Sequence, residues 1–175
     1  MTLLDVGATT LALAGAELPN YLEGQNLFGP EYKAAEYVLG ARDRCDYTID
    51  RIRTVRSDRY RYIRNYYLDR PLMQPGYRDD RPPSMDMRRL FKAGELTEYQ
   101  AEHWFGLRPR EELYDMHADI HQINNLASLS DFRAELLRHR EVLENWINDS
   151  DDQGQYSESD VQLRATYELW KDRDI

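Results

Sequence analysis

The 175-residue sequence lacks the features that mark several large classes of protein. It contains a single cysteine, Cys45, so no disulfide can form within the chain, and cysteine usage does not indicate a compartment. No stretch approaches the roughly 18 consecutive apolar residues of a membrane-spanning helix. A glycine-rich phosphate loop, a G-x-S-x-G elbow and an H-E-x-x-H motif are all absent. No catalytic nucleophile with a general base can therefore be assigned from the sequence.

Positive charge is also scarce, and its distribution is uneven. The formal net charge of −9 argues against a general binder of nucleic acids or anionic membranes, because both need a positive field. Between residues 42 and 64, however, there are eight arginines, four aspartates and no lysine, whereas residues 141–175 hold ten acids and three bases. Arginine suits bidentate contacts with carboxylate, phosphate or sulfate groups. The alternative interpretation of the basic stretch is a strand pair whose exposed face carries Arg–Asp pairs.

The N-terminal segment superficially resembles a signal peptide, because small and apolar residues lead to an Ala-x-Ala-like site at residues 14–16. It lacks a basic n-region, and Asp5 interrupts the apolar run. We therefore predict an ordinary helix over residues 3–14, ended by Gly15, and no signal peptide. Residues 21–30 have turn chemistry and are predicted to be a connector.

Short β-prone runs follow the connector. Residues 36–41 lead into a charged cluster, and residues 49–56 and 59–66 are predicted to form an antiparallel hairpin around Ser57-Asp58. A further short strand is expected at 112–115. Alternation along the hairpin places Tyr60, Tyr62 and Arg64 on one face, and Arg59, Arg61 and Ile63 on the other.

Helical signals occupy most of the remaining sequence. After an irregular loop over 68–83, Ser84 is predicted to cap a helix ending at Gly94, and Thr97 a helix through Trp104. Ser128 with Asp131 resembles a capping box before an apolar helical stripe that extends to residue 148, and a final short helix is expected over 161–170. The predicted fold class is α+β, a small antiparallel sheet of about four strands packed by the helix over 129–148.

Two groups of residues are candidates for a reactive or metal-binding site. His117 and His121 are four residues apart, but their surroundings resemble a turn rather than a helix, so we predict no metal site. Cys45, between Arg44 and Asp46, could be an activated thiol, but no base can be assigned to it. We predict that the chain has no catalytic residues.

Several motifs nevertheless resemble one family, in the order in which that family has them. They are Leu-Ala-Gly-Ala-Glu-Leu-Pro followed by Leu-Glu-Gly-Gln-Asn-Leu-Phe-Gly (13–29), Glu-Tyr-Val-Leu-Gly-Ala-Arg-Asp-Arg-Cys-Asp (36–46), Arg-Thr-Val-Arg (53–56), Arg-Tyr-Arg-Tyr-Ile-Arg-Asn-Tyr (59–66) and Glu-Glu-Leu-Tyr-Asp-Met-His-Ala-Asp-Ile-His-Gln-Ile-Asn-Asn-Leu-Ala (111–127). Together they resemble the C-terminal part of formylglycine-dependent sulfatases, within the alkaline-phosphatase-like superfamily. The pattern is most similar to bacterial sulfatases and to the heparan N-sulfatase type. Ile120 and Gln122 depart from it, since the family usually has Pro and Glu there.

The resemblance implies an intact enzyme that hydrolyses sulfate esters or sulfamates of an anionic carbohydrate such as a glycosaminoglycan. The nucleophile would be a formylglycine made from a C/S-x-P-S/A-x-R motif, and calcium would stabilise charge on the sulfate oxygens. This chain has no such motif, and Cys45 is followed by Asp-Tyr-Thr, so it cannot take that role. We therefore expect no catalysis and no metal or other cofactor in this chain alone. The intact enzyme would be periplasmic or secreted.

The same resemblance divides the chain. Residues 1–30 would be the end of the N-terminal catalytic α/β domain and its connector, 31–149 the C-terminal subdomain, and 150–175 an acidic tail. The expected partners are that catalytic domain and a sulfated carbohydrate, with no nucleic acid and no membrane.

Arg42, Asp43 and Arg44, at a strand end, are predicted to face the mouth of the active site and bind substrate. The alternatives are a salt-bridged corner for these residues, and for the whole chain a stand-alone Arg-rich anion-binding or interaction module without catalysis.

Overall fold

A computed structural model describes residues 1–45 and 48–171 of the chain. Its centre is one antiparallel sheet with the strand order β1-β2-β3-β4. The strands are β1 Val38–Cys45, β2 Thr48–Arg56, β3 Tyr60–Asn65 and β4 Glu111–Asp115. The helices are α1 Leu3–Leu13, α2 Pro82–Ala93, α3 Glu98–Phe105, α4 Arg133–Asp149 and α5 Asp160–Trp170, with 3-10 turns η1 at Ser130–Phe132 and η2 at Gln153–Gln155. The α+β class with four antiparallel strands is confirmed.

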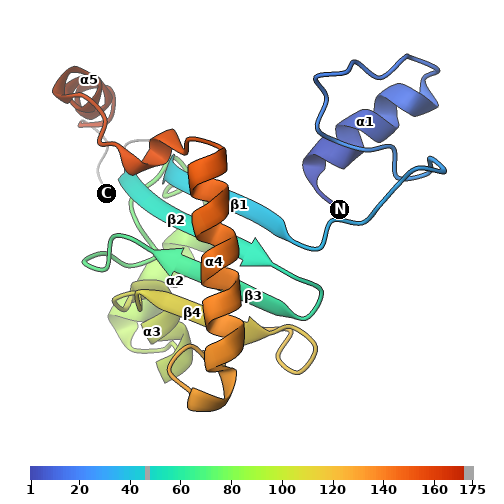
Figure 1. Cartoon of the computed structure of the whole chain (residues 1–175). Helices are drawn as coiled ribbons and strands as arrows, with labels where there is room; N and C mark the ends of the chain where they lie inside the picture. The colour runs from blue at the N-terminus through green and yellow to red at the C-terminus, as the bar shows by residue number, and fades with distance from the viewer. Residues whose placement is uncertain (46–47, 172–175) are drawn as a thin grey trace.

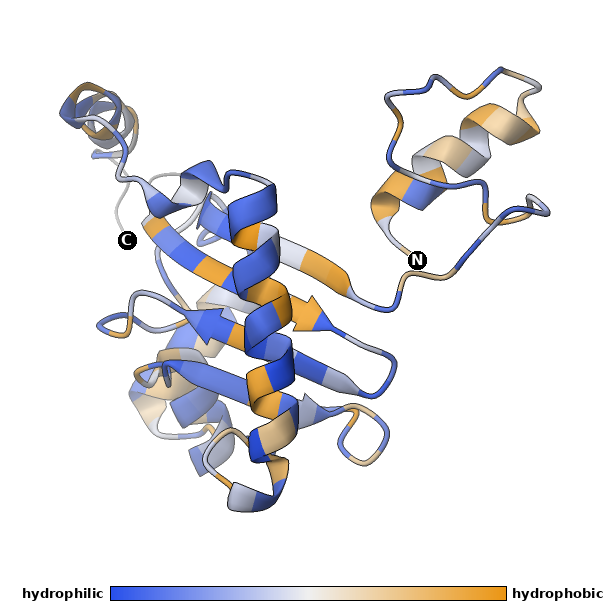
Figure 2. Ribbon diagram, in the orientation of Figure 1, coloured by the Kyte–Doolittle hydropathy of each residue, from blue (hydrophilic) through white to orange (hydrophobic). Residues whose placement is uncertain are grey.

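The sheet has two differently covered faces. Helix α4 crosses one face, whereas α2 and α3 lie on the other (Figure 1). The α4 side holds the apolar core, which consists of Val55, Tyr62, Leu113, Leu136 and Leu143. Hydrophobic and hydrophilic residues alternate along α4 (Figure 2), and Leu136, His139 and Leu143 are its buried residues. Each fully buried Leu or Val stabilises the fold by about 1.5–3 kcal/mol, so the packing of α4 on the sheet contributes strongly to the stability of the fold.

The strand pairing follows the predicted hairpin. Tyr62 is fully buried under α4, and Arg61 and Ile63 line the opposite face, as the alternation predicted. Strand β1 continues beyond Ala41 into the charged cluster, further than its β-prone run indicated, and its register with β2 shifts between Arg42 and Arg44. Such a bulge re-aims side chains, so consecutive residues of this cluster do not simply alternate between the faces.

The helix starts agree with prediction only in part. At Thr97 the capping box is present, with Thr97 Oγ1 accepting from Gln100 N and Gln100 Oε1 accepting from Thr97 N. Ser84 is not a cap: α2 begins two residues earlier at Pro82, because proline suits the first helical turn, where its missing N–H is not needed. Ser128 is not a cap either, because η1 precedes α4 and its Ser130 carbonyl already accepts from Arg133 N.

Helix α1 packs on the connector that follows it rather than on the sheet. Asp5, Ala8 and Thr9 are its buried residues; Asp5 Oδ1 accepts from Gln25 N at 3.1 Å and Thr9 Oγ1 from Leu27 N at 2.9 Å. Those backbone contacts hold the pKa of Asp5 below its ordinary value. The connector comes so close that α1 leaves no room for a side chain at residue 24, which is a glycine.

The expected short C-terminal helix is present as α5, which lies beyond the end of α4 (Figure 1). Among the described residues, no helix combines the length and apolarity needed to cross a bilayer.

Candidate functional site

The three residues predicted to form a substrate site point to three different surroundings. Arg44 reaches the α5 region, where its guanidinium lies 3.0 Å from Glu158 Oε2 and donates to Thr166 Oγ1 at 3.0 Å. Asp43 binds Arg53 at 2.7 Å. Arg42 has only a loose ion pair, 3.7 Å from Asp50 Oδ2. Its Nε is buried without a hydrogen-bond acceptor.

Arg53 is fully buried at the centre of the second contact. Its Nε and Nη2 donate to the two oxygens of Asp152, each at 2.8 Å, in the bidentate geometry that arginine prefers. These hydrogen bonds hold the pKa of Asp152 below its ordinary value. Because Asp152 follows α4, the pair fastens the start of the acidic tail to the middle of the sheet. At least one acidic residue of the tail, Asp152, therefore stabilises the fold by pairing with a buried arginine.

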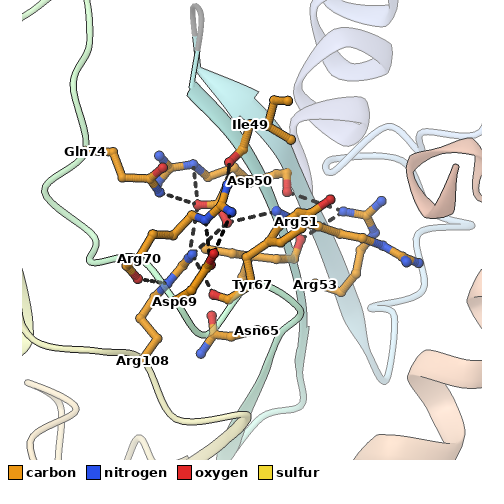
Figure 3. A network of polar contacts seen from close by, with 12 residues as sticks. Ile49, Asp50, Arg51, Arg53, Asn65, Tyr67, Asp69, Arg70, Gln74 and Arg108 are labelled. Carbon is orange, nitrogen blue, oxygen red and sulfur yellow. Dashed lines mark hydrogen bonds and ion pairs between the residues drawn. The ribbon is translucent and has the colours of Figure 1, made fainter. Parts of the chain in front are cut away.

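A second buried carboxylate, that of Asp50 on β2, accepts hydrogen bonds from the segment between β3 and β4. Arg108 donates to both of its oxygens, at 3.0 and 2.9 Å, and Gln74 donates to Oδ2 at 3.0 Å. Figure 3 shows Arg108 and Gln74, both from the segment between β3 and β4, converging on Asp50 of β2. Arg108 also donates to the carbonyls of Tyr67 and Arg70, so the network fixes the long segment between β3 and β4. Nothing in the sequence around Arg108 predicted this role.

A pocket of about 470 Å³ lies on the face of the sheet away from α4. Strands β1 and β3 contribute Arg42 and Arg61 to its lining, and α3 contributes Tyr99 and His103. Asp43 and Arg44 are not among its lining residues. The structure therefore separates the predicted trio, with Arg42 at the pocket, Asp43 on a buried arginine and Arg44 beside α5.

The histidines are scattered. His103 and His121 both line the pocket, whereas His117 lies 3.6 Å from Asp58; His117 and His121 lie in turns, as predicted, and not on a helix. In residues 1–45 and 48–171, no group of three or more His, Cys, Asp or Glu residues could hold a metal ion. Asp46 lies outside the described residues, and with it the predicted thiol environment of Cys45.

One Ser–His contact was not foreseen. Ser57 Oγ lies 3.1 Å from Nε2 of His139, in a separate and larger pocket at the other end of the sheet. Ser57 also exchanges hydrogen bonds with the backbone of Tyr60, and His139 is only 1% exposed and flanked edge-on by tyrosine rings. This geometry closes the turn and packs α4 on the sheet; it does not present a nucleophile.

Comparison with known proteins finds similarity to sulfatases. No family model matches it. Among curated proteins, an ulvan-active sulfatase of Formosa agariphila is 32% identical over 164 residues, spanning 92% of this chain and 27% of that protein. The chain thus spans about a quarter of the length of the curated relative that it matches.

Solved structures share the fold. A candidate sulfatase from Bacteroides thetaiotaomicron superposes with a TM-score of 0.57 and 23% identity, over 91% of this chain and 28% of its own. A 2-O glycosaminoglycan sulfatase gives a TM-score of 0.56 and 22% identity, over 91% and 28%. A third structure, in complex with its substrate D-glucosamine-2-N,6-O-disulfate, gives 0.50 and 17%, over 88% and 25%. These likenesses show that the chain shares its α+β fold with about a quarter of each of these structures.

Proposed function

We propose that the chain works as the subdomain that packs on a sulfatase catalytic domain and shapes the substrate entrance, because it is similar to part of a sulfatase over most of its length. The combined enzyme hydrolyses sulfate esters or sulfamates of an anionic carbohydrate. This substrate class is supported by the ulvan-active relative, by the 2-O glycosaminoglycan sulfatase and by the structure in complex with D-glucosamine-2-N,6-O-disulfate. The chain alone performs no catalysis.

The exposed apolar face of α1 carries the proposal. The helix buries small and polar residues against its connector and leaves its large apolar side chains outside: Leu3 is 88% exposed and Leu13 is 71% exposed. Leu4, Val6 and Leu11 are exposed on the same helix. A helix normally buries its large apolar residues, so this inversion indicates a face that packs on another body of protein. A catalytic domain preceding α1 in the chain order of sulfatases is positioned to cover it.

The entrance role is assigned to the end of β1. Arg42 lines an open pocket with an incompletely bonded guanidinium, and Arg44 stands partly exposed beside α5. Arginines of this kind select sulfated over neutral sugars, because their fork of donors matches a sulfate group. Asp43 fixes the local backbone through its ion pair with Arg53.

Calcium, which the resemblance implies for the intact enzyme, belongs in this proposal to the catalytic domain. The donor set needed for calcium is a cluster of oxygen ligands. Residues 1–45 and 48–171 offer no cluster of three or more acidic, His or Cys side chains for it. When bound elsewhere in the enzyme, calcium would stabilise the charge of the sulfate group.

Co-expression tests the proposal. This chain, carrying an affinity tag, would be expressed with the N-terminal part of the Formosa agariphila relative that precedes the matched segment. Copurification is expected, and Leu4→Asp should abolish it, because an acid on the α1 face cannot be buried unpaired. Val161→Asp is the matched control, since Val161 is a similarly exposed apolar residue in the first turn of α5. Equal copurification of both variants, or none with the unmodified chain, would contradict the proposal.

A further inference from the structure

We propose that the pocket around Arg61 and Arg42 is a binding site for one sulfated or carboxylated sugar unit. All the residues that line this pocket belong to this chain. The sugar class of the ligand rests on the proposed function, whereas its negative charge follows from the pocket itself.

Arg61 is a pocket cation that no carboxylate of the described residues neutralises. Its guanidinium donates to two neutral groups, Gln122 Oε1 at 2.9 Å and Thr54 Oγ1 at 3.4 Å. Within the described part of the chain, no carboxylate lies within ion-pair distance of it. By contrast, Arg53 of β2, Arg64 of β3 and Arg59 just before β3 each have a carboxylate within 3.0 Å. A partly buried guanidinium bound only to neutral acceptors retains its capacity to bind an anion.

The other charges of the pocket reinforce Arg61. Arg42 lines the same space, and its nearest carboxylate oxygen, on Asp50, lies 3.7 Å away and already accepts from Arg108. Glu112 is the acidic residue in the lining. Its two oxygens are occupied, one by Asn65 Nδ2 and the other by the Tyr114 hydroxyl, each at 2.6 Å. The pocket is therefore net positive in a chain whose formal net charge is −9.

The shape of the pocket fits a sugar. Its volume of about 470 Å³ lies in the range of small-molecule sites, roughly 300–1,000 Å³. The absence of a side chain at Gly40 leaves space in the pocket, and a Cβ at this position would lie only 3.1 Å from Thr54 Cγ2. Tyr99 and Tyr114 line the pocket, and their aromatic rings offer apolar surface to the face of a pyranose ring. Burial and the hydrogen bond to Glu112 raise the pKa of Tyr114, so its hydroxyl stays protonated.

Titration of the whole chain with three probes tests the inference. Glucose 6-sulfate, glucose and inorganic sulfate would each be added to the isotopically labelled chain and followed by NMR. Glucose 6-sulfate should shift the ring signals of His103 and His121, which line the pocket, and leave those of His117 unchanged. Glucose and inorganic sulfate should each bind at least about tenfold more weakly, because each lacks one half of the contacts.

Three variants test whether the binding depends on the two arginines. Arg61→Gln and Arg42→Gln should each weaken glucose 6-sulfate about tenfold or more, and Arg61→Lys should retain part of the affinity. Arg133→Gln is the control, because Arg133 is an exposed arginine at the start of α4 on the opposite face of the sheet. Circular dichroism would establish that each variant is folded. The wild-type histidine shifts test the site without any substitution.

Several results would overturn the inference. They are the absence of histidine shifts with glucose 6-sulfate, equal binding of inorganic sulfate, or an equal effect of Arg133→Gln. None of them depends on the contact with a catalytic domain, so failure of copurification would leave this site standing. Conversely, copurification without sugar binding would sustain the proposed function and reject the pocket.

Discussion

The buried pair of Arg53 and Asp152 should be an electrostatic contact on which the stability of the fold depends strongly. Asp152→Asn preserves the shape of the side chain and its turn contact to Gly154, but removes the charge that faces a fully buried guanidinium. Removing one partner of a buried ion pair costs about 3–5 kcal/mol. Because Asp43 remains 2.7 Å from Arg53, we expect the low end, about 3 kcal/mol. For a chain of this size that corresponds to a decrease of about 6–12 °C in Tm.

The matched comparison is Asp43→Asn, which removes a carboxylate from the same arginine. The Asp43 side chain is 51% exposed, compared with 8% for Asp152, so its loss should cost only about 0.2–1 kcal/mol. Urea unfolding monitored by tryptophan fluorescence measures both variants, and calorimetry gives Tm. If Asp43→Asn destabilised the chain as much as Asp152→Asn, burial would not be what sets the strength of these contacts.

Three further changes test other parts of the fold. Leu143→Ala should lower the free energy of unfolding by about 2–5 kcal/mol, because it opens a cavity between α4 and the sheet, and urea unfolding would measure it. Gly24→Ala should separate α1 from its connector, since the added Cβ would lie 2.1 Å from the Leu4 carbonyl oxygen; faster hydrogen exchange in the connector would reveal this, and unchanged exchange would contradict it. The pKa values of Asp115 and Asp152 are depressed by their arginine partners, so their stabilisation should be complete at neutral pH and decrease as pH falls below the ordinary aspartate value of about 3.9; urea unfolding from pH 7 to 3 should show no loss before about pH 5.

The periodicity of the sequence predicted the sheet and its main helix well. Apolar residues at helical spacing located α4, and the alternation of tyrosine and arginine located β3 with the correct faces. These patterns are local consequences of burial against one neighbour, which a single sequence displays directly. Caps were less predictable, because prolines and a 3-10 turn replaced the side-chain caps expected at Ser84 and Ser128.

The candidate site was only partly visible in the sequence. The charged cluster drew attention to Arg42, Asp43 and Arg44, but the bulge in β1 and contacts with α5 and β2 separate their side chains. Their proposed role in substrate selection stays a prediction. Arg61 went unnoticed as a site residue, because its distinguishing property is the lack of a carboxylate partner, and partners come from segments far apart in the chain. The departure at Gln122, an amide where the resembled motif has a carboxylate, was the one available signal.

Release of sulfate from ulvan tests the central claim most directly. The assay compares this chain alone, the N-terminal part of the Formosa agariphila relative alone, and the two co-expressed. We predict no sulfate from this chain alone, little from the N-terminal part, and clear release from the pair. Sulfate released by this chain unaided, or a pair no more active than the N-terminal part alone, would contradict the account.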